Sequence, residues 1–245
     1  MGTKSELVHK LQQDILLWQG FKPASACKGE RIGLGGIEDA FPGGIFPKRA
    51  IHEFITVFPE DAAASDGFIA GLLSALMQDG AACVWISTAR RLFPASLRSF
   101  NVEPERVIFM DVDTEKDALW IMEEALHCEG LAAVVAEVDG ISLVESRRLQ
   151  LAVEESGVTG FILRKDARRM ASTIATARWQ ISHLPSELEA GMPGVGFPRW
   201  QVELLKVRNG IPGNWIMEWA GEGFLEVKRV LQQNGWRDDE SRQIG

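Results

Sequence analysis

The chain has 245 residues, 46% of them hydrophobic, and a formal net charge of −8 at pH 7. This length and apolar content suffice for the core of one large α/β domain, and the negative charge argues against a general nucleic-acid-binding protein. The sequence contains no apolar run of about 18 residues and no basic, apolar leader, so we expect a cytoplasmic protein without a membrane span or secretory signal.

The chain begins with the pattern of a short amphipathic helix. Leu7, Leu11, Ile15 and Trp18 repeat at helical spacing, so they share one face. We expect this N-terminal helix to pack on the chain's own core or on a neighbouring copy, which would give self-association. The stretch 27–47 that follows is rich in Gly and Pro. Its glycines precede the first expected strand, whereas a dinucleotide-binding fingerprint follows a strand, so no cofactor is expected there.

The first strand and the helix after it are expected at residues 49–57 and 67–77, joined by a loop at 58–66. A phosphate-binding loop at such a junction needs closely spaced glycines, a Lys for the terminal phosphates and a Ser or Thr for magnesium. No Lys or Arg occurs between Val57 and Phe68. The junction therefore lacks the cation that holds a nucleoside triphosphate.

Acidic residues strengthen this interpretation. Glu60, Asp61 and Asp66 place three carboxylates in the loop, and like charges about 4 Å apart repel by roughly 4 kcal/mol at an effective dielectric constant of about 20. We interpret the segment as a degenerate phosphate loop that rejects a nucleoside triphosphate. Its key positions hold Pro59, Glu60, Ser65, Asp66 and Gly67.

Short apolar runs separated mostly by helical segments predict four further strands, at residues 82–86, 107–110, 132–136 and 158–163. Such alternation is typical of a mostly parallel sheet that helices cover on both faces. Thr114 and Ser142 stand at capping-box spacing before two of the helices.

After residue 174 the pattern changes to strands joined by turns. Residues 200–207 and 215–219 flank the segment 208–214, which is full of turn residues. An antiparallel extension is therefore expected to complete the sheet. The charged tail from residue 237 has the composition of a disordered segment.

This order of elements resembles a RecA-type recombinase core, and it is more closely similar to the ImuA family, the RecA-like accessory proteins of bacterial mutagenic DNA repair. The segments that carry the resemblance are 41–44 (FPGG), 51–54 (IHEF), 118–125 (ALWIMEEA), 147–152 (RRLQLA), 157–164 (GVTGFILR), 177–180 (ARWQ) and 200–215 (WQVELLKVRNGIPGNW). The resemblance implies an N-terminal helix and linker at 1–28, a RecA-like core at 29–230 and a flexible tail at 231–245.

The chain departs from an active recombinase at its second nucleotide motif. In such a motif an apolar strand ends in an Asp that holds magnesium, whereas residues 133–137 (AVVAE) place Glu137 there, with Asp139 two residues on. A Glu that would activate the attacking water is not evident in residues 86–92. We therefore expect no ATPase activity, no cofactor and no metal.

Other catalytic arrangements are not favoured. The four His residues are scattered, without a metalloprotease or nucleophile-elbow motif. His52 adjoins Glu53 within a strand, so their side chains point to opposite faces, and His52 is expected to be structural. Cys27, Cys83 and Cys128 are far apart, and we expect free, buried thiols in place of a disulfide or metal site.

A basic cluster stands out in this acidic protein between residues 147 and 178. It is either a solvated face with local ion pairs or a site for DNA phosphates or an acidic partner. The candidate binding residues are Arg147, Arg148, Arg164, Lys165, Arg168, Arg169 and Arg178, with Lys206 and Arg208 from the C-terminal hairpin. Four tryptophans could stack on bases, but at strand positions we expect them in the core: Trp179, Trp200, Trp215 and Trp219.

The resemblance implies partners. ImuA proteins work with ImuB, a catalytically inactive relative of Y-family polymerases, and with an alternative polymerase III alpha subunit in damage-induced translesion synthesis. We expect a non-catalytic member of such an assembly, with RecA and DNA as further candidate partners. A weak DNA-dependent ATPase of the RecA type and a SulA-like inhibitor of cell division are the alternatives.

Overall fold

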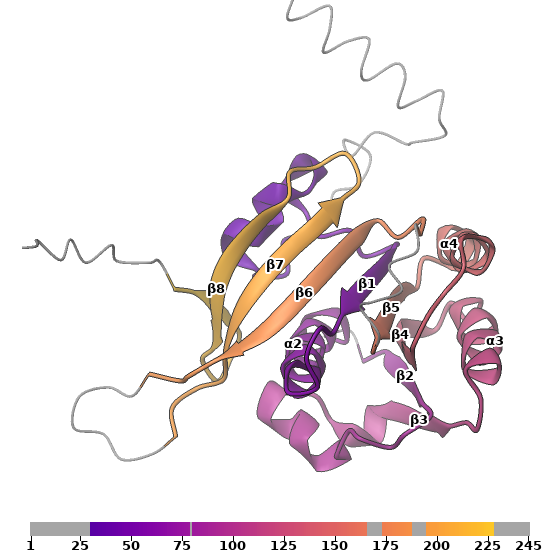
Figure 1. Cartoon of the computed structure of the whole chain (residues 1–245), viewed down its shortest axis with the longest axis horizontal. Helices are drawn as coiled ribbons and strands as arrows, with labels where there is room; N and C mark the ends of the chain where they lie inside the picture. The colour runs from indigo at the N-terminus through magenta and orange to yellow at the C-terminus, as the bar shows by residue number, and fades with distance from the viewer. Residues whose placement is uncertain (1–29, 79, 166–172, 188–194, 228–245) are drawn as a thin grey trace, which may run out of the picture.

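The structure, a computed structural model, describes residues 30–78, 80–165, 173–187 and 195–227 (Figure 1). The expected N-terminal helix, Cys27 and the expected flexible tail lie outside the described residues.

The described residues form one sheet of nine strands, which are β1 (Ile51–Ile55), β2 (Ala82–Ser87), β3 (Val107–Asp111), β4 (Leu131–Val138), β5 (Thr159–Arg164), β6 (Ala177–Leu184), β7 (Arg199–Val207), β8 (Gly213–Trp219) and β9 (Phe224–Glu226). The strand order is β3-β2-β4-β5-β1-β6-β7-β8-β9. Neighbours from β3 to β6 pair in parallel, and neighbours from β6 to β9 pair antiparallel. The expected RecA-like α/β fold with an antiparallel C-terminal extension is confirmed.

The α-helices of the described residues are α2 (Asp61–Leu76), α3 (Glu115–Leu126) and α4 (Leu143–Ser156). Both expected caps are present. Asp117 N–H donates to Thr114 Oγ1 at 3.1 Å, and Ser142 and Glu145 form a reciprocal capping box. Such caps satisfy the first backbone N–H groups of a helix and so fix where α3 and α4 begin.

Four short 3-10 segments complete the described elements: η2 (Gly35–Ala40), η3 (Pro42–Gly44), η4 (Pro94–Phe100) and η5 (Pro104–Arg106). The Gly-rich approach segment therefore folds as turns. Gly36 N–H donates to the Glu226 carboxylate at 2.8 Å, which joins η2 to the last strand.

The start of α2 differs from the sequence expectation. The helix begins at Asp61 and not at Gly67, so the connection after β1 is only residues 56–60. Three consecutive alanines, 62–64, favour the helical backbone, and a carboxylate in the first turn interacts favourably with the helix dipole. The expected helix was placed on the apolar run that begins at Gly67, but the alanines before it extend the helix by almost two turns.

The helices cover the sheet on two sides, with α2 on one face and α3 and α4 on the other (Figure 1). Alternate residues of β1 point into the two layers, so His52 and Phe54 face α2 whereas Ile51 faces α3 and α4. All five residues of β1 are buried, as expected for a central parallel strand.

The C-terminal strands close over α2 with aromatic side chains. Trp179, Trp200 and Trp219 are buried and Trp215 packs against the same cluster, so the expectation that they fill the core is confirmed. A Cβ on Gly71 of α2 would lie 2.5 Å from Phe224, which shows how closely strand and helix approach. No helix in the described part of the chain is long and apolar enough to cross a membrane.

Candidate functional site at the carboxyl edge of the sheet

The carboxyl ends of β1, β4 and β5 meet at one edge of the sheet, where open α/β sheets bind ligands. Thr56 N–H donates to Arg164 O at 2.9 Å, and Lys165 N–H donates to Val138 O at 3.1 Å, so backbone bonds tie the strand ends together. The connection 56–60 above this edge contains no glycine. A phosphate-binding nest needs successive N–H groups that approach the anion closely, and this short connection does not offer them.

Glu137, at the position of the second nucleotide motif, is buried and engaged within the protein. Its Oε1 accepts a hydrogen bond from Trp85 Nε1 at 3.0 Å, and its Oε2 lies 3.1 Å from Lys165 Nζ. Trp85 lies on β2 and Lys165 follows β5, so the strands on both sides of β4 supply these partners. Both carboxylate oxygens have a protein partner, and a magnesium ion would have to displace the lysine to reach them.

Three residues assigned to the degenerate loop lie elsewhere. Ser65, Asp66 and Gly67 belong to α2, which corrects their interpretation as loop residues. A Cβ on Gly67 would lie 3.1 Å from Phe100, so this glycine allows close helix packing and has no role in phosphate approach. Of the five residues, Pro59 and Glu60 remain in the connection, where both are exposed.

The negative charges also differ from the sequence expectation. Asp61 is buried, and its Oδ1 accepts a hydrogen bond from His183 N–H at 3.1 Å. Burial, reinforced by the negative charge of Glu137, raises the pKa of Asp66 to about 7. Among these three acidic residues of the segment, Asp61 is buried, Asp66 is half-buried and only Glu60 is exposed. Repulsion within the loop is therefore weaker than expected, and the Glu137–Lys165 pair is the stronger obstacle to a nucleotide.

We expect Asp66→Asn to stabilise the protein at neutral and higher pH. The folded-state pKa of about 7 lies above the ordinary value of 3.8, so the native state binds more protons than the unfolded state between these values. Stability therefore falls as pH rises through this window. The variant should raise the free energy of unfolding by roughly 1–3 kcal/mol at about pH 8 and change it little near pH 4. Urea denaturation across this range measures the effect, and a gain independent of pH would contradict the assignment.

Two members of the basic cluster are held by a buried carboxylate. Arg164 Nη1 lies 2.8 Å from Glu53 Oε1, and Arg178 Nε lies 2.8 Å from Glu53 Oε2. Thr173 Oγ1 donates to the same Oε2 at 2.9 Å. The side chains of Glu53 and Arg164 are 0% and 1% exposed. This corrects the surface position expected for Arg164, which cannot reach a DNA phosphate from the interior, and Arg178 is largely committed to the same carboxylate.

Two hairpin cations lie near this network. Lys206 Nζ donates to Thr173 O at 3.0 Å, and partial burial, together with the charge of Arg178, lowers the pKa of Lys206. Arg208 is half-buried, and its N–H donates to Thr176 O at 2.7 Å.

The cations of α4 are on the surface. Arg148 Nη2 lies 2.6 Å from Glu123 Oε2, whereas the exposed guanidinium of Arg147 makes no ion pair or hydrogen bond within the described part of the chain. Arg168 and Arg169 lie outside the described residues. The structure therefore does not bring the seven candidate cations that it describes together into one binding surface.

His52 is a structural residue, as expected. It is buried, stacks on Phe46 with a centroid distance of 4.4 Å, and its Nδ1 accepts a hydrogen bond from Trp179 Nε1 at 3.3 Å. Its Nε2 lies 2.8 Å from Pro47 O, to which the neutral tautomer donates. Burial lowers the pKa of His52 to about 4, so it stays uncharged in the core.

The cysteine expectation holds in part. Cys83 is a buried free thiol whose pKa is raised by burial, but Cys128 is exposed, which corrects the expectation for that residue. Cys128 follows the end of α3, where the chain turns toward β4 at the surface. Within the described residues, no group of three or more His, Cys, Asp or Glu side chains is arranged to hold a metal ion.

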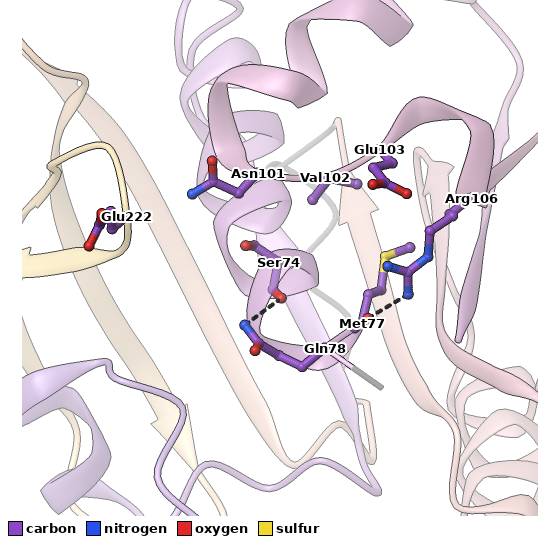
Figure 2. Close-up of a pocket in the computed structure, with 8 residues that line it drawn as sticks. All are labelled: Ser74, Met77, Gln78, Asn101, Val102, Glu103, Arg106 and Glu222. Carbon is purple, nitrogen blue, oxygen red and sulfur yellow. Dashed lines mark hydrogen bonds between the residues drawn. The ribbon is translucent and has the colours of Figure 1, made fainter. Parts of the chain in front are cut away.

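A separate pocket of about 250 Å³ lies at the carboxyl-terminal end of α2 (Figure 2). It is lined by Ser74, Met77, Gln78, Asn101, Val102, Glu103, Arg106 and Glu222. Arg106 Nη2 donates to Met77 O and, at 2.7 Å, to Ala81 O. The guanidinium of Arg106 thus satisfies carbonyls at and just after the end of α2, and none of the predicted site residues lines the pocket.

The comparison with known proteins identifies the family. The chain is 34% identical over 215 residues to "Protein ImuA" from each of two strains of Caulobacter vibrioides, and the match covers 82% of this chain and 88% of each relative. The chain belongs to the ImuA family. No family model matches it. Membership of the ImuA family supports a role in damage-induced mutagenesis.

Sequence reasoning missed the partners that define the ImuA site. The sequence predicted no partner for Glu53, since its neighbour His52 points to the opposite face, and it gave no role to Trp85. Each acts through a residue distant in sequence, with Arg164 111 positions after Glu53 and Glu137 52 positions after Trp85. The available signal was a carboxylate inside an otherwise apolar strand, because such a charge needs a buried partner.

Proposed function

We propose that this ImuA protein is a non-catalytic, RecA-like accessory factor of damage-induced translesion DNA synthesis. It acts through protein contacts with an ImuB-like Y-family polymerase homologue and with an alternative polymerase III alpha subunit. RecA and DNA are further candidate partners. The main support for a non-catalytic role is the ion pair between Glu137 and Lys165, which occupies the place where a nucleotide's magnesium would be held.

Phosphoryl transfer depends on positioning and charge stabilisation by groups that this site lacks. The connection 56–60 offers no Lys and no glycine, and α2 begins with Asp61, a carboxylate. The ammonium group of Lys165 lies at the edge but neutralises Glu137. Removing several parts of such a site together leaves little catalysis, because the parts act as one unit.

The expected result is that the protein does not bind ATP, with or without magnesium, more tightly than about 1 mM, or about −4 kcal/mol. Isothermal titration measures this. Submillimolar, magnesium-dependent binding would favour the weak-ATPase alternative.

The partner assignment is tested with purified proteins and in cells. The ImuB-like homologue from the same genome should bind this chain in pull-down and titration, whereas a cell-division GTPase should not. Deletion of the gene should lower damage-induced mutation frequency, and the Asp66→Asn variant, which leaves the exposed surface intact, should restore it. Binding to the division GTPase alone would favour the SulA-like alternative.

A further inference from the structure

Within the described residues, every large apolar side chain that an α-helix exposes lies on α3 or α4. These side chains are Trp120, which is 59% exposed, Leu143 (53%), Val144 (71%) and Leu151 (56%). The helix on the other face of the sheet, α2, exposes none. Single exposed apolar residues are ordinary, but several on two adjacent helices mark an interaction site.

An ion pair sets how the two helices align. Arg148 of α4 donates through Nε to Glu123 Oε1 of α3 at 3.0 Å. Trp120 precedes Glu123 by three residues and Val144 precedes Arg148 by four, so each lies one turn before the bridge on its own helix. Leu151 lies one turn after the bridge. The three apolar side chains therefore lie on the outer side of the α3–α4 pair, along a length of about two turns.

The same stripe carries a cation that has no partner among the described residues. Arg147 lies between Val144 and Leu151 in the helical repeat, and its exposed guanidinium makes no ion pair or hydrogen bond within the described part of the chain. Lys116, one turn before Trp120, adds a second exposed cation. A partner with complementary charge would present carboxylates to Arg147 and Lys116.

The composition of this surface favours a protein partner over nucleic acid. Glu123 and Glu124 follow Trp120 by three and four residues on α3, and Glu123 already pairs with Arg148. This surface therefore offers few cations for the row of phosphates that nucleic acid presents. Trp and Arg surrounded by aliphatic side chains are, by contrast, the residues that most often dominate protein interfaces. The basic residues of α4 thus lie among exposed apolar side chains and do not form a continuous basic patch.

We propose that the α3–α4 surface, made of Trp120, Val144, Arg147 and Leu151, docks an acidic amphipathic helical segment of a partner protein. The apolar side chains of that segment, three or four residues apart, would cover Trp120 and Leu151, and its carboxylates would pair with Arg147. The proposal rests on the proposed function only in that the protein acts through protein contacts.

The test starts with a photo-cross-linker, benzoylphenylalanine, in place of Val144 in the full-length chain in its native cells after DNA damage. The expected result is a cross-link to a single segment with net negative charge and apolar residues at helical spacing. The same reagent in place of Ala63, an exposed position on α2, should not capture that segment. No cross-link, or one only to DNA or to another copy of this chain, would overturn the proposal.

The mapped segment is then synthesised and titrated against the full-length protein. Trp120→Ala and Arg147→Glu should each weaken its binding at least about tenfold, and a Glu→Lys change in the peptide should recover part of the loss with Arg147→Glu. Both residues are exposed, so neither variant should move the denaturation midpoint. Binding within about twofold of the wild type would reject the surface.

The outcomes separate this proposal from the proposed function. If the mapped segment belongs to a protein other than the ImuB-like homologue or the polymerase III alpha subunit, the docking surface stands and the partner assignment fails. If the ImuB-like homologue binds this chain but the mapped segment binds wild type and Trp120→Ala equally well, the partner assignment stands and the docking surface fails.

Discussion

Replacing Glu53 with Gln is expected to lower the free energy of unfolding by about 3–5 kcal/mol. The glutamine keeps the size of the side chain but removes the negative charge that Arg164 and Arg178 share at 2.8 Å each. A buried arginine that loses its carboxylate partner keeps the full cost of its desolvation, which is larger than the attraction that a surface pair contributes. Urea denaturation followed by tryptophan fluorescence measures the loss.

The chain offers a matched control for this prediction. Glu123 pairs with Arg148 at 2.6 Å, but the arginine is 58% exposed, so the same substitution, Glu123→Gln, should cost less than about 1 kcal/mol. The two variants make the same chemical change at a buried and at a surface ion pair. Equal losses would show that burial is not what makes the Glu53 network stabilising.

The second large effect is expected for Lys165→Ala, which leaves Glu137 without its counter-ion. Glu137 is 4% exposed at its side chain and would retain the hydrogen bond from Trp85. We expect a loss of about 3 kcal/mol at neutral pH. The loss should shrink as pH falls, because an unpaired buried carboxylate can protonate and so escape the cost of its charge.

A double variant and a surface lysine control this second prediction. Adding Glu137→Gln to Lys165→Ala should recover at least half of the stability, because no buried charge then remains unpaired. Lys116→Ala, at an exposed position of α3, should change stability by less than about 0.5 kcal/mol. A pH-independent loss for Lys165→Ala would contradict the ion-pair interpretation.

The two predictions concern adjacent strands of one ImuA sheet. Arg164 is the last residue of β5 and pairs with Glu53 of β1, while Lys165 follows it and pairs with Glu137 of β4. Successive side chains of an extended segment point to opposite faces, so one cation enters each layer. The end of β5 thus supplies one cation to each of these two buried carboxylates, and Arg178 of β6 adds a second cation for Glu53.

Local patterns predicted most of the fold because their physical causes are local. Apolar runs at 82–86 and 158–163 became β2 and β5, and the Ser142–Glu145 capping box marked the start of α4. The start of α2 was missed because the helix was placed on the apolar run from Gly67, whereas the three alanines before it, which have the highest helix propensity, also belong to the helix.

The candidate site was less predictable, because its properties depend on burial and on contacts between distant residues. No local pattern shows that Arg164 is interior, that Asp66 is raised in pKa by burial, or that Lys165 reaches Glu137. In each case the deciding quantity is the loss of water around a charge, which is known only when the sheet and helices have assembled.

The sequence by itself determined most strands and helices in chain order, but not β6 and β9. It also determined the parallel core with its antiparallel extension and the absence of a phosphate-binding lysine in the first connection. These follow from periodicity and residue type. Only the tertiary structure decided which charged side chains are exposed and can contact a partner. Arg164 is buried against Glu53, Lys165 pairs with Glu137, and Arg147 is exposed beside Val144. The two buried pairs join residues that lie far apart in the sequence, because a charge inside a low-dielectric core needs a partner of opposite charge.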